Sequence, residues 1–397
     1  MRTSGLVLTH SLTHSLTHSL THSLTPCVSF SAVPPGTYGL KGIMTNVTYW
    51  EVDKQYHAIT LEATGAVGPV PIDLTAPAAS QSFFIDGDPV GSAFTSVGIN
   101  TNFPDSPHTY ANLYNSYLEN AYNNYLVDLA QPHGHAQRVW RWHDAGIGGG
   151  YQTATNGLSV WSQTSLSGEH LYRADVGNEN VAVWGNCSFA YFYTFPGVLC
   201  LEPGTQTLAL EAVPGKGWAP AEGNNSTILW ALTVPPGFSG ALLTAYDGYD
   251  PNATIYASIP LPACADNASI VAMAIRNSQI HLLASDGIVS RIDLDPTTGL
   301  PAASGAVPVM SFNVTAVGNL TSNQANQGYT GPIAVDVAGR VFVAVDAVDS
   351  ILVVDNTSNT LIGKMQYENS KSSGSVQMKP FGIKAMTTCE ISTFTAS

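Results

Sequence analysis

The chain is poor in charged residues, and the scarcest of them are basic. Asp, Glu, Lys and Arg make up only 11% of its 397 residues, against roughly 25% in ordinary soluble domains. Ser, Thr, Asn, Gln and Gly must therefore cover much of the surface, a composition typical of proteins outside the cell. With 14 Lys and Arg against 28 Asp and Glu, the net charge is -14, which repels phosphate backbones and anionic lipid. We expect neither nucleic acid nor a membrane surface as a partner.

Cysteines and long apolar runs are scarce too. The five cysteines include no Cys-x-x-Cys spacing, which argues against thioredoxin-like, c-type haem and zinc-ribbon sites. We expect one or two disulfides at most. Cys187 and Cys200 lie in one repeat, but a hairpin turning at Pro196-Gly197 would set Cys200 near Phe192, so the two cysteines are not predicted to lie directly opposite each other. No run of 18 apolar residues occurs, so no membrane span is predicted.

The N-terminus has no recognisable secretory signal. Such a signal needs an apolar stretch after a basic start, but Arg2 is followed by Leu-Thr-His-Ser repeated within residues 8–25. This repeat has no apolar face at a helical or a strand period, so residues 1–33 are predicted to be a disordered low-complexity tail. The tract resembles a translated four-nucleotide repeat. We expect that a faulty gene model replaced the true N-terminus.

Recognisable catalytic motifs are absent. The sequence has no Gly-x-Ser-x-Gly, Ser-x-x-Lys or His-Glu-x-x-His motif, and the glycines around Gly148 lack the Lys-Ser/Thr of a phosphate-binding loop. Three carboxylates, Asp336, Asp346 and Asp349, fall where turn residues are expected. The catalytic residues, if there are any, are therefore unknown from the sequence.

What the chain does contain is a repeat. Four stretches within residues 181–365 each hold three or four short runs rich in Val, Ile, Leu and aromatic residues, separated by Gly, Pro, Asn or Asp. An acidic residue recurs at spacings of 45, 48 and 60 residues, at Glu202, Asp247, Asp295 and Asp355. A four-stranded antiparallel sheet cannot bury both faces alone, and sheets that repeat about every 40 to 50 residues stack around a ring. The sequence therefore predicts an all-β fold, a β-propeller of four-stranded antiparallel blades.

Turns and one insert refine this prediction. Asp286-Gly287, Ser239-Gly240 and Ala338-Gly339 have the composition of strand reversals. Residues 304–330 are rich in Asn, Ser, Gly and Thr and lengthen the last repeat. We predict that they form a loop that hangs off a blade.

The remaining segments are assigned around this pattern. Residues 34–104 alternate like strands and are predicted to form a β-rich region, one more blade that helps to close the ring near Trp50. Residues 105–130 are predicted to form a helical insert, because tyrosines and leucines recur at spacings of three and four after Pro107. This stripe favours packing on the core, with an aromatic platform for carbohydrate as the alternative. Residues 131–397 are predicted to hold the blades, in a ring that is incomplete or closed by the β-rich region.

One polar cluster suggests a metal site. Two histidines at positions i and i+2 of an extended segment can ligate one ion, and a nearby His and Asp can complete the set. The candidate ligands are His133, His135, His143 and Asp144. The alternative is a polar loop that leads into a blade.

Sequons suggest glycosylation. The chain has nine Asn-x-Ser/Thr sequons, about twice the number that its composition gives by chance. They lie at Asn46, Asn186, Asn224, Asn225, Asn252, Asn267, Asn313, Asn319 and Asn356. Asn224 and Asn225 overlap, and we predict Asn225 as the modified one. The sequons and the low charge predict an extracellular or secretory-pathway protein; the alternative is that a surface rich in Asn and Thr creates sequons by chance.

Several phrases resemble known propeller repeats. GVLCLEPGTQTLALE (residues 197–211) and SRIDLDPTTG (residues 290–299) resemble the PQQ-type repeats of quinoprotein-like propellers, in which Leu-Asp-Pro leads into a Thr-Gly turn. GPIAVDVAGRVFVAVDAVDSILVVD (residues 331–355) is more similar to the NHL type. Both resemblances imply the propeller fold. The first also implies pyrroloquinoline quinone (PQQ) with calcium at the propeller axis, and oxidation of alcohols or sugars.

The chain departs from the quinoprotein pattern in two ways. Enzymes of that family carry a Trp a few residues beyond the Thr-Gly turn, where this sequence has Leu210, Tyr256 and Ile362, and the paired cysteines over the quinone are absent. We therefore predict a secreted propeller without catalytic activity that binds a protein or carbohydrate ligand or acts as a scaffold. The alternatives are a quinone-dependent oxidoreductase and a polysaccharide-cleaving enzyme with carboxylates in its channel.

Overall fold

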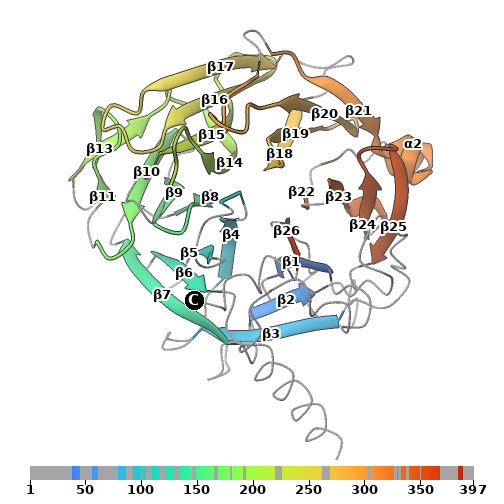
Figure 1. The fold of residues 1–397 in the computed structure, drawn as a ribbon, viewed down its shortest axis with the longest axis horizontal. Helices are drawn as coiled ribbons and strands as arrows, with labels where there is room; N and C mark the ends of the chain where they lie inside the picture. The colour runs from blue at the N-terminus through green and yellow to red at the C-terminus, as the bar shows by residue number, and fades with distance from the viewer. Residues whose placement is uncertain are drawn as a thin grey trace, which may run out of the picture.

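The apolar runs form strands that pair mostly with their neighbours along the chain, and in the computed structural model the described strands build six blades around a ring (Figure 1). We number the blades 1 to 6 in chain order. Blades 1 and 2 form one eight-stranded sheet, because their outer strands β3 (Ala79–Ile85) and β7 (His135–Asp144) pair in parallel. The structure describes residues 38–44, 56–60, 79–85, 93–100, 102–103, 110–116, 122–128, 135–144, 149–164, 169–178, 181–190, 194–219, 226–261, 269–302, 306–325, 329, 332–336, 339–348, 350–366 and 383–387.

Blade 1 combines strands from both ends of the described chain. From the centre outward it contains β26 (Ile383–Thr387), β1 (Tyr38–Met44), β2 (Tyr56–Thr60) and β3 (Ala79–Ile85). β26 and β1 are antiparallel, with Tyr38 opposite Thr387. This pairing closes the ring with help from the β-rich region, as predicted. Trp50 itself and residues 1–33 lie outside the described residues.

Blade 2 contains strands where the sequence predicted a helix. Its strands are β4 (Ala93–Ile99), β5 (Tyr110–Ser116), β6 (Tyr122–Asp128) and β7 (His135–Asp144). β5 and β6 pair with each other and lie between β4 and β7. The predicted helical insert at residues 105–130 is therefore wrong. Tyr at spacings of three and four fits one helical face, but Tyr prefers strands and the intervening Asn residues disfavour a helix, so pairing with the neighbouring strands decides the conformation.

Blade 3 has four strands and two short additional strands. It contains β8 (Gly149–Thr155), β9 (Ser159–Thr164), β10 (His170–Asp175) and β13 (Thr194–Cys200), with β11 (Val181–Ala182) paired to β10 and β12 (Cys187–Ala190) paired to β13. The predicted turn at Pro196-Gly197 is wrong, because both residues lie inside β13. Ser188 pairs with Pro196 and Cys187 with Val198. Gly197, with φ +79°, is thus the extra residue of a bulge.

Blades 4, 5 and 6 are four-stranded antiparallel sheets, as the repeat predicted. Blade 4 contains β14 (Gln206–Pro214), β15 (Thr227–Val234), β16 (Ala241–Asp247) and β17 (Ile255–Leu261). Blade 5 contains β18 (Ile270–Arg276), β19 (Gln279–Ala284), β20 (Ile288–Asp293) and β21 (Val309–Asn313). Blade 6 contains β22 (Ile333–Val335), β23 (Arg340–Val345), β24 (Ser350–Asp355) and β25 (Thr360–Gln366).

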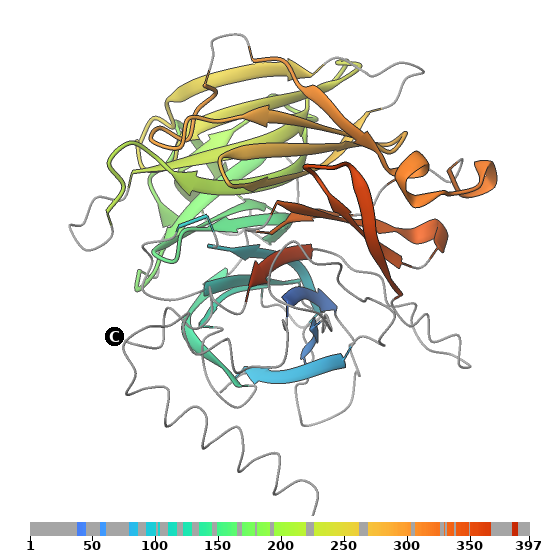
Figure 2. The ribbon, with the colours of Figure 1, turned by 45° about the vertical axis from the view of Figure 1, so that its right-hand side comes forward.

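The predicted insert is only partly a loop. β21, the outer strand of blade 5, lies within residues 304–330, so the prediction that this whole segment hangs off a blade is wrong. The short helix α2 (Val314–Gly318) follows at the rim of the ring, where Figure 2 shows it projecting outward. Two more short helical segments are α3 (Ser322–Ala325) and η5 (Asp346–Val348). Among the described residues, no helix is long and apolar enough to cross a membrane.

Three of the four acidic repeat positions occupy equivalent turns. Asp247 and Asp355 are the last residues of the third strands of blades 4 and 6, and Asp295 lies two residues after the third strand of blade 5. Oδ1 of each accepts a hydrogen bond from the backbone N–H two residues further on, at 2.8, 2.7 and 2.8 Å. Glu202 instead lies in the link between β13 of blade 3 and β14 of blade 4. The first copy of the repeat therefore spans two blades.

The core of blades 4 to 6 lies between the blades, because their sheets are apolar on both faces. One cluster joins blades 4 and 5 and includes Trp230 and Leu282; the next joins blades 5 and 6 and includes Leu283 and Val343. Adjacent residues of β19 thus face opposite neighbours, as the alternation of a strand requires. This packing places the turns after the first and third strands of a blade on one face of the ring, which we call the turn face.

Candidate functional site

Tryptophans dock blade 3 on blade 4 and blade 4 on blade 5 at the turn face. Trp161 on β9 and Trp230 on β15 are buried, and their Nε1 atoms donate to the carbonyl oxygens of Gly248 and Gly299, at 3.2 and 3.1 Å. Each acceptor lies in the turn between the third and fourth strands of the following blade. In PQQ-type repeats the docking Trp lies beyond the Thr-Gly turn, whereas these two tryptophans lie in the second strand of the preceding blade. Gly299 of that turn accepts the hydrogen bond.

A polar seam holds blades 3 and 4 together beside the first of these contacts. Arg173 Nη1 donates to the carbonyl oxygens of Gly248 and Tyr249, both at 3.2 Å, and Nη2 donates to Asp175 at 3.1 Å. The Tyr249 hydroxyl lies 2.9 Å from Ser159 Oγ, and burial raises the pKa of this phenol. Because these groups are engaged with one another, the seam positions the turns and offers no opening to a ligand.

A loop of blade 2 contacts blade 4 at this face. Asn102 Nδ2 donates to the carbonyl oxygen of Ala212 on β14, at 3.2 Å. Phe103 packs on Trp218, with ring centroids 5.0 Å apart. Both aromatic side chains are buried. The loop therefore brings a polar side chain from blade 2 to the end of blade 4.

A pocket of 330 Å³ opens on the turn face where this loop meets blades 4 and 5. Blade 4 contributes the end of β14, and blade 5 contributes the end of β18 and two of its turns. The lining residues are Asn102, Val213, Pro214, Ile275, Arg276, Asn277, Ser278, Leu294, Pro296 and Gly299. The volume lies in the range of small-molecule sites, and the walls are mainly apolar with a few polar groups. This pocket is the candidate functional site.

Among the described lining residues, Arg276 is the one that carries a charge. Its side chain is 7% exposed. Burial lowers the pKa of its guanidinium to about 10, although Asp336 and Glu211 act in the opposite direction. Glu211 lies on β14, and Asp336 follows β22, so inner strands of three consecutive blades bring these charges together.

The Asp336 carboxylate is already engaged within blade 6. Oδ2 accepts from Arg340 Nε at 2.5 Å, and Oδ1 accepts from the backbone N–H of Arg340 at 2.8 Å. Arg340 Nη2 forms an ion pair with the same carboxylate. Asn277 Nδ2 donates to the backbone carbonyl of Asp336 at 3.4 Å, which ties the pocket's turn to blade 6. The sequence analysis named Asp336 only as a turn residue, and no sequence pattern linked it to Asn277, because the two lie 59 residues apart in the chain.

The predicted metal ligands do not form one site. β7 begins at His135 and ends at Asp144, so at about 3.3 Å per residue roughly 25–30 Å separate His135 from His143 and Asp144. One ion cannot bridge that distance, and the prediction of a shared site is wrong because an extended segment places only near neighbours together. His133 lies outside the described residues. Among the described residues, no group of three or more His, Cys, Asp or Glu could hold a metal ion.

Five of the predicted glycosylation sites fall on described residues. Asn186, Asn252 and Asn319 are exposed, whereas Asn313 and Asn356 are half-buried. Asn313 caps α2 by accepting from the backbone N–H of Ala316 at 3.2 Å. Its side chain is therefore already in use. Asn46, Asn224, Asn225 and Asn267 lie outside the described residues.

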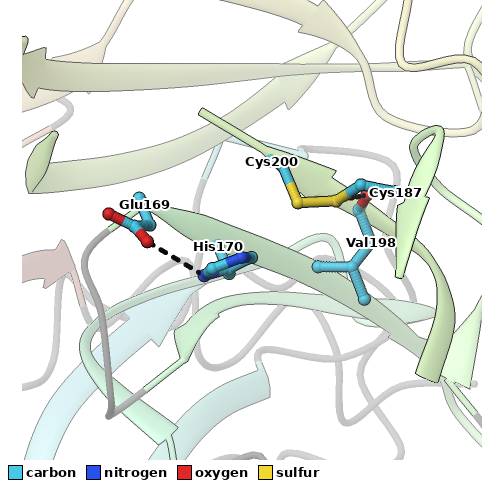
Figure 3. The surroundings of a disulfide bond; sticks show 5 residues. All are labelled: Glu169, His170, Cys187, Val198 and Cys200. Atoms are coloured by element: carbon cyan, nitrogen blue, oxygen red, sulfur yellow. Dashed lines mark hydrogen bonds and ion pairs between the residues drawn. A yellow bond between two sulfur atoms is a disulfide. The ribbon is translucent and has the colours of Figure 1, made fainter. Parts of the chain in front are cut away.

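Cys187 and Cys200 form a disulfide between β12 and β13, beside Glu169 and His170 (Figure 3). Their Cα atoms are 6.0 Å apart, a usual distance for a disulfide. Cys187 pairs with Val198, so the two cysteines are not directly opposite each other, as predicted, but Cys200 lies two residues further along β13 and within reach of the disulfide. The expectation that Cys200 lies near Phe192 is wrong, because the hairpin does not turn at Pro196-Gly197. Burial lowers the pKa of the adjacent His170, and Glu169 partly offsets this effect.

No protein-family model matches the chain, and no curated protein matches it. Solved structures with similar folds include a nidogen/laminin complex (TM-score 0.45, 9% identity, covering 88% of this chain and 98% of that one). Another is the Cps50 (Swd1) β-propeller domain of Myceliophteria thermophila (TM-score 0.44, 11% identity, covering 82% and 90%). A third is the calcium-binding protein regucalcin of Agrobacterium tumefaciens (TM-score 0.35, 13% identity, covering 68% and 73%). At these scores the similarities add nothing to the strand topology, which by itself defines a β-propeller.

Proposed function

We propose that the protein is a secreted, non-catalytic binding propeller that holds its ligand in the pocket between blades 4 and 5. The observation that carries this proposal is the pocket itself. Loops from three blades meet there around one buried cation, and the walls are fixed by the packing of the blades. A preformed apolar pocket with a few polar groups is the usual form of a ligand site.

Secretion is supported by two further features. The Cys187–Cys200 disulfide suits an oxidising compartment. Asn186, Asn252 and Asn319 expose their sequons on the surface. We expect protein from its native source to lose apparent mass on treatment with an N-glycosidase. An unchanged mobility would remove the support that the sequons give to secretion.

The pocket is tested by filling it. Pro296 is exposed at its mouth, so Pro296→Trp should occupy the space without disturbing the core. Thr357→Trp places the same side chain in the corresponding exposed turn of blade 6 and serves as the control. In ligand-observed NMR with a mixed library of neutral, charged and sugar fragments, we expect hits that Pro296→Trp abolishes and Thr357→Trp keeps. A library without hits, or hits that survive in both variants, would count against the pocket.

The quinone alternative is not favoured by the described residues. PQQ carries three carboxylates, and Arg276 is the one cation that lines the pocket. Calcium takes six to eight oxygen ligands, and no described group of acidic residues supplies a set. We expect thermal melts with PQQ and calcium to show no shift, since only a ligand that binds the native state raises the melting temperature. A saturable rise accompanied by dye reduction with alcohols or sugars would establish the oxidoreductase instead.

A further inference from the structure

We propose that the Cys187–Cys200 disulfide is a reversible redox site, which an external dithiol opens and an external disulfide closes again while blade 3 stays folded. The inference goes beyond the proposed function and does not depend on the pocket. It rests on the place of the bond in the blade and on the contacts that hold each cysteine without it.

The disulfide lies where a reductant can reach it. It joins β12 and β13, the two outermost strands of blade 3. Cys187 and Cys200 are both half-buried, whereas the neighbouring Val198 is fully buried. Exchange requires that an attacking thiolate reach a sulfur atom, and exposed disulfides are the labile ones. The outer edge of the blade therefore favours exchange with an external thiol.

The bond joins strands that are already paired. Cys187 pairs with Val198, and Ala190 pairs with Thr194 near the other end of β12. The two cysteines are 13 residues apart in the chain, and the hairpin of β12 and β13 already closes this short loop. A disulfide stabilises a fold mainly by restricting the unfolded chain, and it does so more strongly in longer loops. Reduction should therefore leave the native hairpin in place.

The chain just before Cys187 is held by blade 4. Trp184 is buried, and its Nε1 donates to the carbonyl oxygen of Asp247 at 2.7 Å. The backbone N–H of Gly185 donates to the carbonyl oxygen of Pro251 at 2.8 Å. Both acceptors lie at the end of β16 or in the turn that follows it. These contacts do not involve the disulfide, so they keep Cys187 in position after the bond opens.

The other cysteine is held by blade 3, and one of the two thiols formed on reduction has an acceptor at hand. Cys200 lies opposite His170 of β10 in the antiparallel ladder. Sγ of Cys187 lies 2.9 Å from the carbonyl oxygen of Val198, which can accept the hydrogen of the Cys187 thiol (Figure 3). Two thiols that the fold holds side by side re-form their bond faster than two thiols on a loose chain.

The exchange balances with the dithiol as the reductant. One of its thiolates bonds to one sulfur of the pair, the S–S bond breaks, and its electron pair leaves on the other cysteine sulfur, which takes up a proton. The second thiolate of the dithiol then displaces the first cysteine, which also takes up a proton. The dithiol is oxidised to a disulfide, and Cys187 and Cys200 are reduced to thiols. An external disulfide reverses both steps.

The first test measures reduction of the native full chain. Dithiothreitol is added without denaturant, free thiols are alkylated, and peptide mass spectrometry distinguishes Cys187 and Cys200 from the rest of the five cysteines. We expect both to be labelled at a rate within about tenfold of that of the urea-unfolded chain, with unchanged near-ultraviolet circular dichroism, and we expect oxidised glutathione to restore the bond. Labelling only after unfolding, loss of the dichroism on reduction, or failure of the bond to re-form would each overturn the inference.

The second test displaces the chain before Cys187. A Cβ added at Gly185 would lie 2.4 Å from backbone atoms of Val198 and Leu199, so Gly185→Ala pushes this segment away from β13. Gly177→Ala is the control, because Gly177 also has a positive φ but nothing lies within 4 Å of an added Cβ. After reduction, Gly185→Ala should re-form the bond at least about tenfold more slowly, and Gly177→Ala should match the unaltered chain.

Equal rates of re-formation in the two variants and the unaltered chain would show that the contacts before Cys187 do not hold it for exchange. If Gly185→Ala does not fold, reduction and re-formation of the bond in the unaltered chain still decide the question. Failure of either test leaves the pocket between blades 4 and 5 untouched.

Discussion

At the scale of the residue, the buried His281 on β19 links stability to pH. Its side chain is 1% exposed, and neither ring nitrogen has a hydrogen-bond partner among the described residues. Burial lowers its pKa to about 4, with Arg291 adding to the effect and Asp293 opposing it. An unfolded His has a pKa of about 6.5. Between these values the unfolded chain binds more protons than the native one, so stability is complete above about pH 6.5 and is lost as the pH falls towards 4.

This difference in pKa gives a measurable prediction. His281 should cost the native state about 3 kcal/mol of unfolding free energy between pH 7 and pH 4. Urea unfolding of His281→Leu should therefore show a flatter pH dependence than the unaltered chain. His170→Leu is the comparison, because His170 is less deeply buried and Glu169 partly offsets its shift. If the unfolding free energy of His281→Leu depends on pH as steeply as that of the unaltered chain, the acid sensitivity has another origin.

At the scale of the element, turns hold the strands of a blade in register. Gly287, between β19 and β20, has φ +83°, and a Cβ added there would lie 2.4 Å from a ring carbon of Tyr329. Gly237, between β15 and β16, has φ +72°, with nothing within 4 Å of an added Cβ. Both glycines therefore adopt a left-handed backbone conformation, but only at Gly287 would an added Cβ also collide with another side chain.

Comparing Gly237→Ala with Gly287→Ala separates the cost of a left-handed backbone from the cost of a steric clash. Gly237→Ala should cost only the left-handed backbone, roughly 1–2 kcal/mol of unfolding free energy. Gly287→Ala should cost about 1–3 kcal/mol more, because the buried Tyr329 ring must move. Chemical denaturation of both variants gives the two values. Equal losses would mean that the ring moves freely and that only the backbone matters.

Elements were predictable from sequence to the extent that their signals are local. The blade-forming runs of residues 227–366 and the Asp-Gly turn at Gly287 come from patterns a few residues long, and the structure confirms them. The tyrosine stripe of β5 and β6 reads equally well at a helical period, and only the neighbouring strands decide it. The bulge at Gly197 escaped detection for the same reason, and the pairing of Cys187 with Cys200 depends on it.

At the scale of the whole molecule, the ring creates the pocket and hides it from sequence analysis. Asn102, Pro214 and Arg276 belong to three different blades and meet only because blades 4 and 5 pack on each other and a loop of blade 2 reaches blade 4. No pattern in the chain links them. The fold was therefore predictable from a repeat, whereas the candidate site required the distances between blades.

Ring closure itself depends on β26, which supplies the inner strand of blade 1. Its five residues pair with β1, and Ala385 lies opposite Leu40. A chain that ends at residue 382 should leave the edge of β1 unpaired and prone to pairing with another chain. We expect its melting temperature to fall by roughly 5 °C or more and its light scattering to reveal self-association.

A synthetic peptide of residues 380–390 should restore both properties by adding the missing strand. The same peptide with Ala385→Pro cannot donate a backbone hydrogen bond at that position and should restore neither. A shortened chain that melts like the full one would show that the ring does not depend on this closure.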